Sequence, residues 1–451
     1  MEPFRHHVFV CTQQKAEGVP CCAAHRSHEL LEKLQRELSS RRLDQDVQVT
    51  SCGCLGTCDH GPMVLVYPEG VWYSGVTPTD VPDIVASHLA RGKVLTRLAR
   101  SDAEAMKAEI LDHRKQYLAM LKAKDEAGVL PDDIDSIIRG YWPSRAVLTA
   151  LELDLFSAVG DGASAMQVAA VSGTDERATE MLLNALVSLG LLIKKDNVFD
   201  NSPESKRFFT SGSTDNARPG LLHIANLWNR WSNLTDCVRT GTCVPVRTST
   251  DWTQSFMAAM HRNARQRAAS VVKTVGAEKI GRMLDLGGGS GAYSIAFAAA
   301  NPELTAEILD VPDVVPIAER NIRAAGLSER IKVRDGDMLS TELGNGFDLV
   351  FLSAICHMFS PDENRKLFAR ARAALAKHGR LVIQDFILEP DKTSPRFGAM
   401  FSLNMLVSTK GGASYSQTEY ESWLLSAGFS GVRHERLPGP ANLIIASPAV
   451  R

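Results

Sequence analysis

The sequence predicts an α/β protein made of three successive domains, the last of which is built on a doubly wound parallel sheet. The chain has 451 residues, more than one ordinary hydrophobic core supports, so several domains are expected. Six of its nine cysteines lie before residue 59, which sets the first part of the chain apart. In the last part, short β-type runs alternate with helical segments, as they do in the βαβ units of a parallel sheet.

Composition excludes several classes of protein. A hydrophobic fraction of 44%, a charged fraction of 23% and a net charge of −2 are typical of a globular protein that binds neither nucleic acid nor an acidic membrane. No run of 18 apolar residues occurs, so no membrane span is expected. The first residues, MEPFRHHVFVCTQQ, lack an apolar signal core, which predicts a cytoplasmic protein. In that reducing compartment, a dense group of cysteines favours metal or redox chemistry over structural disulfides.

Residues 1–96 predict a small domain with the element order β-α-β-β-α. The β-type runs HHVFVC and DVQVTSC flank a helical pattern of leucines in SHELLEKLQRELSSRRL. The segment MVLVYPEGVWYSGV predicts a hairpin that turns at residues 68–70, and TDVPDIVASHLARG predicts a closing helix. This order is that of a thioredoxin-like domain.

The same residues resemble the thioredoxin-like 2Fe–2S ferredoxins over essentially the first hundred positions. The resemblance is carried by a C-x-x-x-C pair before Gly-Pro and by the hairpin VYPEGVWYSGVTPTDV. Soft thiolates suit iron–sulfur chemistry, and four of them commonly bind such a cluster. The resemblance implies a 2Fe–2S cluster and an electron donor or acceptor protein as partner. Its implied ligands are Cys11, Cys22, Cys54 and Cys58.

Alternatives remain for this cysteine cluster. Cys21 adjoins Cys22 and is the other candidate for the second ligand, while Cys52 is left as a spare thiol. A zinc site is a different interpretation, because zinc also uses closely spaced cysteine pairs. A thioredoxin-like dithiol is weaker, since no C-x-x-C lies between a strand and a helix.

The next two segments are predicted to be mostly helical. Residues 97–128 are charged and helix-prone, and Gly128 is the expected stop, so we expect a connecting helix that is a solvated spacer. Residues 129–265 predict a helix-turn-helix followed by the ribbon LLIKKDNVFD, a winged-helix pattern. The second helix, DERATEMLLNALVSLGL, is acidic and apolar and lacks the basic stripe that DNA binding needs. The apolar segment GYWPSRAVLTALELDLF instead favours a dimerisation domain and a homodimer.

Residues 266–451 predict the doubly wound sheet. Its expected strands are RMLDLGG, TAEILDV, IKVRDGD, FDLVFLSAI, GRLVIQDF and ANLIIAS. The turn DLGGGSG after the first strand allows close approach of the backbone to a ligand. Gly287, Gly289 and Ala292, with Asp310 about twenty residues on, would also pass for a dinucleotide fingerprint, so this motif alone leaves a nicotinamide cofactor as a rival.

Over residues 130–451 the chain resembles the class I S-adenosylmethionine (SAM)-dependent O-methyltransferases of the caffeate and hydroxyindole type. The resemblance is carried by DLGGGSG, LDVPDV, GDM and FDLVFLSAICHMFS. It implies a Rossmann-like methyltransferase domain preceded by a winged-helix dimerisation domain, with SAM as cofactor. The implied cofactor-binding residues are Asp285, Gly287, Gly289, Gly291, Asp310, Asp337, Met338 and Ser353.

The resemblance also implies that His357 is the catalytic residue. An imidazole exchanges protons near neutral pH, so it can take the proton of a hydroxyl as the oxygen attacks the sulfonium methyl. Departures from the family pattern surround it: Met358 follows the histidine, Ser353 replaces a lysine, and Ser414 stands where an acid is expected to orient the histidine. Glu419 aligns with a structural position, so His357 is expected to lack its carboxylate. The expected acceptor-binding residues are Met260, Trp231, Phe401, Asn404 and Met405.

Together these observations predict a cytoplasmic SAM-dependent methyltransferase with a fused 2Fe–2S domain. The expected acceptor is a hydroxyl of a ring-containing small molecule. Two other functions stay open at this point. One is methyl transfer to, or demethylation of, a non-hydroxyl or reduced acceptor with electrons from the cluster. The other is a redox-sensing or electron-transfer protein whose methyltransferase half only binds a ligand.

Overall fold

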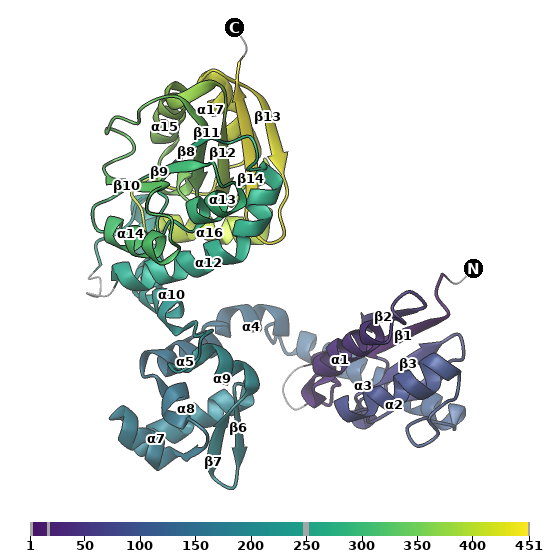
Figure 1. Cartoon of the computed structure of the whole chain (residues 1–451). Coiled ribbons are helices and arrows are strands. Elements are labelled where there is room, and N and C mark those ends of the chain that lie inside the picture. The colour runs from purple at the N-terminus through teal and green to yellow at the C-terminus, as the bar shows by residue number, and fades with distance from the viewer. Residues whose placement is uncertain (1–2, 16–18, 247–251, 450–451) are drawn as a thin grey trace. The chain divides into compact units, whose positions relative to one another are not determined.

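The computed structural model describes residues 3–15, 19–246 and 252–449 (Figure 1). The chain divides into two compact units, Met1–Gly140 and Tyr141–Arg451. Among the described residues, no helix has both the length and the apolar character needed to cross a membrane.

A mixed four-stranded sheet of order β2-β1-β3-β4 forms the centre of the first unit. β1 and β2 are parallel, whereas β3 is antiparallel to both β1 and β4, as the predicted hairpin requires. Leu30, Leu34 and Leu38 of the predicted helix are buried against this sheet. The elements are β1 (His6–Cys11), α1 (Ser27–Ser40), β2 (Val47–Cys52), β3 (Val64–Tyr67), β4 (Val71–Tyr73), the short turns around α2 (Val81–Asp83) and η4 (Ile84–Leu89), α3 (Ala103–Glu126) and α4 (Asp132–Arg139).

The second unit begins with a mostly helical part. A helix pair, α7 and α8, is followed by the ribbon β6–β7, and the short β5 completes a sheet of order β5-β7-β6. Asp175 caps α8 by accepting the Ala178 amide, as an N-cap residue should. The elements are α5 (Tyr141–Glu152), α6 (Leu155–Val159), β5 (Ala163–Ser164), α7 (Ala165–Ser172), α8 (Glu176–Ser188), β6 (Leu192–Lys195), β7 (Val198–Asn201), α9 (Pro203–Phe209), α10 (Arg218–Trp231), α11 (Leu234–Thr240) and α12 (Trp252–Val275).

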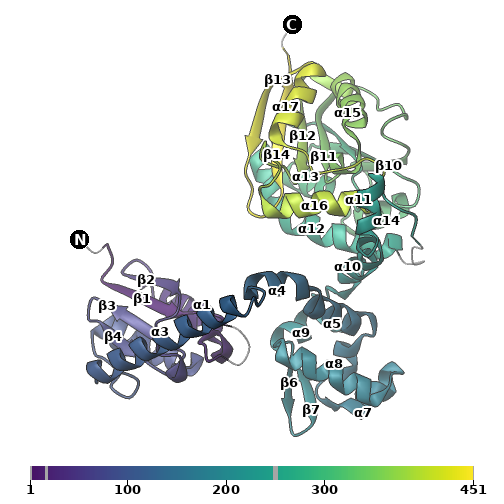
Figure 2. The same ribbon diagram turned by 180° about the vertical axis from the view of Figure 1, so that it is seen from behind.

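A seven-stranded sheet of order β10-β9-β8-β11-β12-β14-β13 forms the rest of this unit. Figure 2 shows it with helices on both faces. Phe368 of α15 and Trp423 of α17 pack on one face, and Val271 of α12 and Phe297 of α13 on the other. The elements are β8 (Arg282–Leu286), α13 (Ala292–Ala300), β9 (Thr305–Asp310), α14 (Val315–Ala324), β10 (Ile331–Asp335), β11 (Phe347–Ser353), η5 (Cys356–Met358), α15 (Pro361–Ala374), β12 (Leu375–Asp385), α16 (Arg396–Leu406), α17 (Gln417–Ser426), β13 (Phe429–Glu435) and β14 (Asn442–Pro448).

The order of the strands locates a ligand crevice. The first five strands of the sheet are parallel, and the chain switches direction across the sheet between β8 and β11. In a doubly wound sheet the ligand binds at the carboxyl ends of the strands beside such a switch. The six predicted strands are present, but the sheet ends in an antiparallel pair, β14 and β13, of which β13 was not predicted.

Candidate functional sites

The predicted cluster ligands lie in two pairs in the first unit. Cys54 Sγ is 3.2 Å from Cys58 Sγ, and Cys11, at the end of β1, is hydrogen-bonded to Cys22. The Cys22 hydrogen bond lowers the pKa of Cys11 to about 6 and raises the pKa of Cys22, so this pair readily holds one thiolate. Gly61 lies between the two pairs. A Cβ on this residue would be 2.8 Å from Cys22 Sγ and 3.5 Å from the Cys58 carbonyl oxygen.

This arrangement fits a 2Fe–2S cluster, in which four thiolates bind two irons. Of the two adjacent candidates, Cys22 is hydrogen-bonded to Cys11 and packs with Cys11 and Met63, whereas Cys21 lies outside this cluster. Cys11, Cys22, Cys54 and Cys58 would therefore hold the cluster, which supplies one-electron chemistry when bound.

A cation lies beside one thiol of this group. Lys15 donates from Nζ to Cys58 Sγ at 3.0 Å, and Nζ is also 5.8 Å from the centre of the Tyr117 ring. Burial lowers the pKa of Lys15, but the hydrogen bond to Cys58 and the nearby thiols together raise it by more than burial lowers it. The net shift is upward, and the ammonium stays charged.

The predicted spacer helix is partly integrated into the cysteine site. Gly56, between Cys54 and Cys58, has a φ of +91°, and a Cβ there would lie 2.9 Å from Ile110 Cγ2 of α3. His113 of α3 bonds to the Asp59 carboxylate at 3.0 Å. The first half of α3 thus covers the loop that carries two of the thiols, whereas Leu118 in the second half is exposed.

In the second unit, the glycine turn after β8 lies at the ligand crevice. Gly287, Gly289 and Gly291 have φ values of +68°, +57° and +75°, which glycine adopts without strain. A Cβ on Gly287 would lie 2.4 Å from Ile355 Cδ1. Because Ile355 is two residues before His357, this contact brings the predicted cofactor turn and the predicted catalytic segment together.

Two buried aspartates flank the turn. Asp310, at the end of β9, accepts the Gly289 amide at 2.7 Å and the Val311 amide at 2.8 Å. Its carboxylate still has lone pairs for a pair of hydroxyls, as the ribose role requires. Asp285 accepts only from Ser294 Oγ, at 2.7 Å, and its Oδ1 has no hydrogen-bond partner. Burial raises the pKa of Asp285 to about 7.

The remaining predicted cofactor residues lie around the same crevice. The Met338 side chain is buried and approaches Gly287, with its Cε 3.2 Å from the position of a Cβ on that glycine. Asp337 is exposed and accepts the Leu339 amide at 2.9 Å. Ser353, at the end of β11, donates to Gln384 Oε1 at 2.8 Å. The sequence analysis named Met260 of α12 but not two nearby residues of that helix: Met257 lies against Gly289, and His261 bonds to Ser290 Oγ at 2.9 Å.

His357 does have a carboxylate partner, which corrects the expectation from the sequence. Its Nδ1 is 2.6 Å from Oδ1 of Asp385, the last residue of β12. β11 and β12 are parallel neighbours, so their carboxyl ends place the histidine and the aspartate side by side. An acid at the carboxyl end of a predicted strand was the signal that could have identified Asp385, as it did Asp310. Ser414 contributes no charge, and Glu419 binds Ser416 and Lys392.

This geometry sets the tautomer of the histidine. A carboxylate only accepts hydrogen bonds, so Nδ1 carries the proton and Nε2 is the nitrogen left to act as a base. Both side chains are buried, with exposed fractions of 6% for His357 and 2% for Asp385. Two aromatic rings border the imidazole: Phe401 at 4.8 Å between ring centres, edge to face, and Phe386 at 5.9 Å, stacked.

The structure brings together only some of the predicted acceptor residues. Phe401 is beside His357, and Trp231 Nε1 donates to Asn404 Oδ1 at 2.9 Å, which joins α10 to α16. Met405, on the same helix as Asn404, is buried with 6% of its surface exposed.

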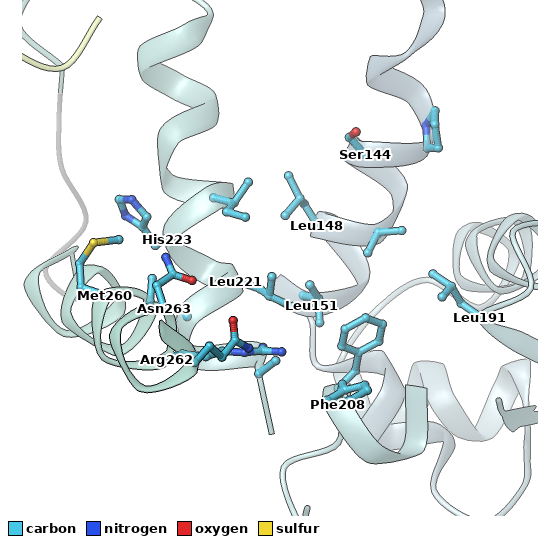
Figure 3. A pocket seen from close by; sticks show the side chains of 18 of the residues that line it. Ser144, Leu148, Leu151, Leu191, Phe208, Leu221, His223, Met260, Arg262 and Asn263 are labelled. Carbon is cyan, nitrogen blue, oxygen red and sulfur yellow. The ribbon is translucent and has the colours of Figure 1, made fainter. Parts of the chain in front are cut away.

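Met260 lines the wall of a cavity of about 760 Å³. Figure 3 shows Met260, His223 and Asn263 on one side of this cavity, with Ser144 and Leu148 across from them. Neither His357 nor Phe401 lines it.

A doubly wound sheet with a glycine turn, a ribose-type aspartate and a histidine–aspartate pair at one crevice defines a SAM-dependent methyltransferase. Models of three families match the chain: the O-methyltransferase domain at residues 238–430, the O-methyltransferase dimerisation domain at 136–211, and the thioredoxin-like [2Fe-2S] ferredoxin at 2–88. The chain belongs to the O-methyltransferase family. It is an O-methyltransferase that uses SAM and carries a 2Fe–2S ferredoxin domain.

Individual proteins agree with this assignment. The 3-hydroxy-5-methyl-1-naphthoate 3-O-methyltransferase of Streptomyces sahachiroi is 31% identical over 329 residues, which are 70% of this chain and 94% of that protein. The 2Fe-2S ferredoxin of Clostridium pasteurianum is 47% identical over 96 residues, which are 21% of this chain and 94% of that protein. The solved structure of PigF with SAH matches 71% of this chain and 100% of its own, with 28% identity and a TM-score of 0.66.

Proposed function

We propose that the protein transfers the methyl group of SAM to a hydroxyl on an aromatic ring of a small molecule. The observation that carries this proposal is the His357–Asp385 pair, bordered by Phe386 and Phe401 at the ligand crevice. The flat apolar faces of the two rings suit an aromatic acceptor, and the imidazole suits a hydroxyl that must lose its proton. The named substrate of the Streptomyces sahachiroi relative, a hydroxynaphthoate, has both features.

Different residues of the chain would carry out the separate parts of the reaction. When bound, SAM supplies an electrophilic methyl group on a sulfonium. His357 Nε2 takes the proton of the acceptor hydroxyl, and Asp385 holds Nδ1 and stabilises the resulting imidazolium. Asp310 would hold the ribose hydroxyls, while the glycine turn leaves room for the cofactor backbone.

The presence of Asp385 weakens the case for the alternative acceptor. A reduced or non-hydroxyl acceptor stayed open as an alternative because the histidine was expected to lack a carboxylate. With this pair in place, the site needs no electron to activate a hydroxyl. We therefore assign the cluster to an accompanying redox role, with an electron donor or acceptor protein as its partner.

We also propose a cytoplasmic homodimer. The match to a dimerisation domain begins at residue 136, and Ile137, Ile138, Tyr141 and Trp142 at its start are all more than half exposed, from 54% to 71%. Exposed apolar side chains in such a run are typical of a subunit interface. All nine cysteines are unpaired, as a reducing compartment allows.

Methyl transfer from labelled SAM tests the proposed acceptor. Naphthols and phenols should be methylated on oxygen, and the matching arenes without a hydroxyl should not react. His357→Ala should lower kcat by about 10²–10⁴-fold, the usual contribution of a general base. His378→Ala, at the exposed other end of β12, is the control and should keep full activity. Methylation of the hydroxyl-free arenes, or full activity of His357→Ala, would overturn the proposal.

A further inference from the structure

The Asp385 carboxylate is surrounded by four hydrogen-bond donors. Oδ1 accepts from His357 Nδ1 at 2.6 Å and from the Phe386 amide at 2.8 Å. Oδ2 accepts from the His357 amide at 3.1 Å and from the Tyr420 hydroxyl at 3.2 Å. A carboxylate with 2% of its surface exposed stays charged only when donors replace water, so each of these contacts matters for the pair.

Tyr420 is the one donor of these that belongs neither to His357 nor to Phe386, the residue after Asp385. It lies on α17, whose start is fixed by a capping box between Ser416 and Glu419. Its side chain has 1% of its surface exposed, and its ring lies 5.8 Å from that of Trp423 and 6.1 Å from that of Tyr415. This packing fixes the ring, and the hydroxyl lies within hydrogen-bonding reach of both the Asp385 carboxylate and the Cys356 thiol.

The neighbouring positions explain why this donor is needed. Ser414 stands where the resemblance led us to expect an acid, and its hydroxyl has no hydrogen-bond partner. Within the described chain, Asp385 is the one carboxylate that hydrogen-bonds to His357. Any rotation of the Asp385 carboxylate would therefore also change the orientation of the His357 imidazole.

We propose that Tyr420 is a positioning residue for methyl transfer. Together with the His357 amide, its hydroxyl fixes Oδ2 of Asp385, so that Oδ1 faces Nδ1 of His357 and Nε2 faces the acceptor. This inference rests on the proposed function, because it assumes that His357 is the base. Tyr420 is buried and would act through its hydrogen bond to Asp385.

The other ionisable groups near the His357–Asp385 pair are either neutral or held in other contacts, so Asp385 is the carboxylate that acts on the imidazole. Burial, together with the Asp385 charge, raises the pKa of Tyr420 well above its ordinary value, so the phenol keeps the proton that it donates. Burial likewise raises the pKa values of Cys356 and Tyr415, and both stay neutral. The two nearby glutamates, Glu363 and Glu419, are held in helix caps. The charged and titratable groups around the pair are Cys356, Glu363, Tyr415, Glu419, Tyr420 and, behind Phe386, Arg267.

Removing the hydroxyl has a predictable direction. In Tyr420→Phe, less of the Asp385 charge is taken up by donors on Oδ2, so more of it acts on the imidazolium. His357 then holds its proton to higher pH, and the acid limb of the kcat profile moves to higher pH. At neutral pH kcat should fall about three- to tenfold, the effect expected of one hydrogen bond, with an unchanged KM for SAM.

Tyr415→Phe is the matched control. This tyrosine is equally buried in the same aromatic group, but its hydroxyl donates to the Phe359 carbonyl oxygen. It should keep the wild-type pH profile whatever it costs in thermal stability. A purely structural role of Tyr420 would instead give both variants the wild-type profile, or the same shift, and either result would overturn the proposal.

A second measurement separates this inference from the proposed function. NMR titration of His357 in protein labelled at histidine nitrogen needs no acceptor. The titration should move upward in Tyr420→Phe and not in Tyr415→Phe. If the His357 titration does not move in Tyr420→Phe, the positioning role is wrong. If the wild-type enzyme methylates no hydroxyl, the proposed function is wrong, and the NMR titration still tests the contact between Tyr420 and Asp385.

Discussion

Three buried aspartates at the carboxyl edge of the sheet differ in how many donors surround them. Asp385 accepts four hydrogen bonds, Asp310 accepts two, and Asp285 accepts one. Because donors replace the lost water, the number of donors decides how readily a buried carboxylate ionises. The four donors thus fix the orientation of the Asp385 carboxylate beside His357. Burial with a single donor raises the pKa of Asp285 to about 7.

This difference predicts a pH effect on stability. The pKa of Asp285 is about 7 in the folded protein and 3.8 ordinarily, so its contribution to stability is full below 3.8 and is lost as the pH rises through 7. Asp285→Asn mimics the protonated form and avoids this loss. In SAM-free protein, its free energy of unfolding relative to wild type should rise by on the order of 1–2 kcal/mol between pH 5.5 and pH 8. Chemical unfolding at both pH values checks this, and an equal difference at both would contradict it.

The cysteines predict a second residue-level result. Cys54→Ser should abolish the visible absorbance of the 2Fe–2S cluster and its iron content, because it removes one of the four thiolates. Cys52→Ser should keep both, since Cys52 pairs with neither thiol pair and packs at the edge of the group. Iron and sulfide analysis with absorption spectra of the anaerobically purified proteins measures the outcome. Retention of the cluster by Cys54→Ser would remove this cysteine from the ligand set.

At the scale of elements, the strands and the residues that end them were predictable. Their apolar runs are continuous, as buried parallel strands require, so the ends that carry Asp285 and Asp310 could be placed. β13 was missed because its segment FSGVRHE is mostly polar and lies at the sheet edge. The pairing of His357 with Asp385 depends on the side-by-side ends of two strands, which spacing along one chain does not reveal.

The sequence predicted the extent of α3 but not its contact with the cysteine loop. Its composition is that of a solvated helix, and the predicted boundaries were near, but its contact with the cysteine loop depends on Gly56 and Ile110 coming together in the fold. Ile110 and its exposed neighbour Leu111 look equivalent in sequence, although Leu111 has 51% of its surface exposed. A single apolar residue on a charged helix carries too little signal to identify such a contact.

That contact predicts how α3 protects the cluster. Ile110→Asp should place a charge against Gly56 and loosen α3 from the loop between Cys54 and Cys58. The cluster absorbance should then bleach faster under an iron chelator. Leu111→Asp adds the same charge on the exposed side of the helix and should bleach at the wild-type rate. Equal rates for all three proteins would show that α3 does not shield the cluster.

At the scale of the whole molecule, the sequence shows the two chemistries but not how they are divided between folded units. The division falls at Gly140, inside a segment that is helical on both sides. The predicted cluster ligands all lie before this point, and the predicted cofactor and base residues all lie after it. The predicted residues of each chemistry therefore fall within a single unit.

Assembly is the property of the whole molecule that can be tested most directly. Ile137, at the end of α4, has 71% of its surface exposed and lies at the start of the matched dimerisation domain. In a two-fold interface each residue is buried twice, so burying Ile137 contributes about 3 kcal/mol or more per dimer. Ile137→Glu should therefore raise the Kd of the dimer by about 10²-fold or more.

Light scattering across a dilution series measures this shift. Leu425→Glu is the matched control, because Leu425 has 54% of its surface exposed but lies on α17 against the methyltransferase sheet, outside the matched dimerisation domain. The control should dissociate at the wild-type concentration, whereas Ile137→Glu should be a monomer at micromolar concentration. A wild-type protein that is already a monomer there would refute the dimer. Equal dissociation of both variants would move the interface away from α4.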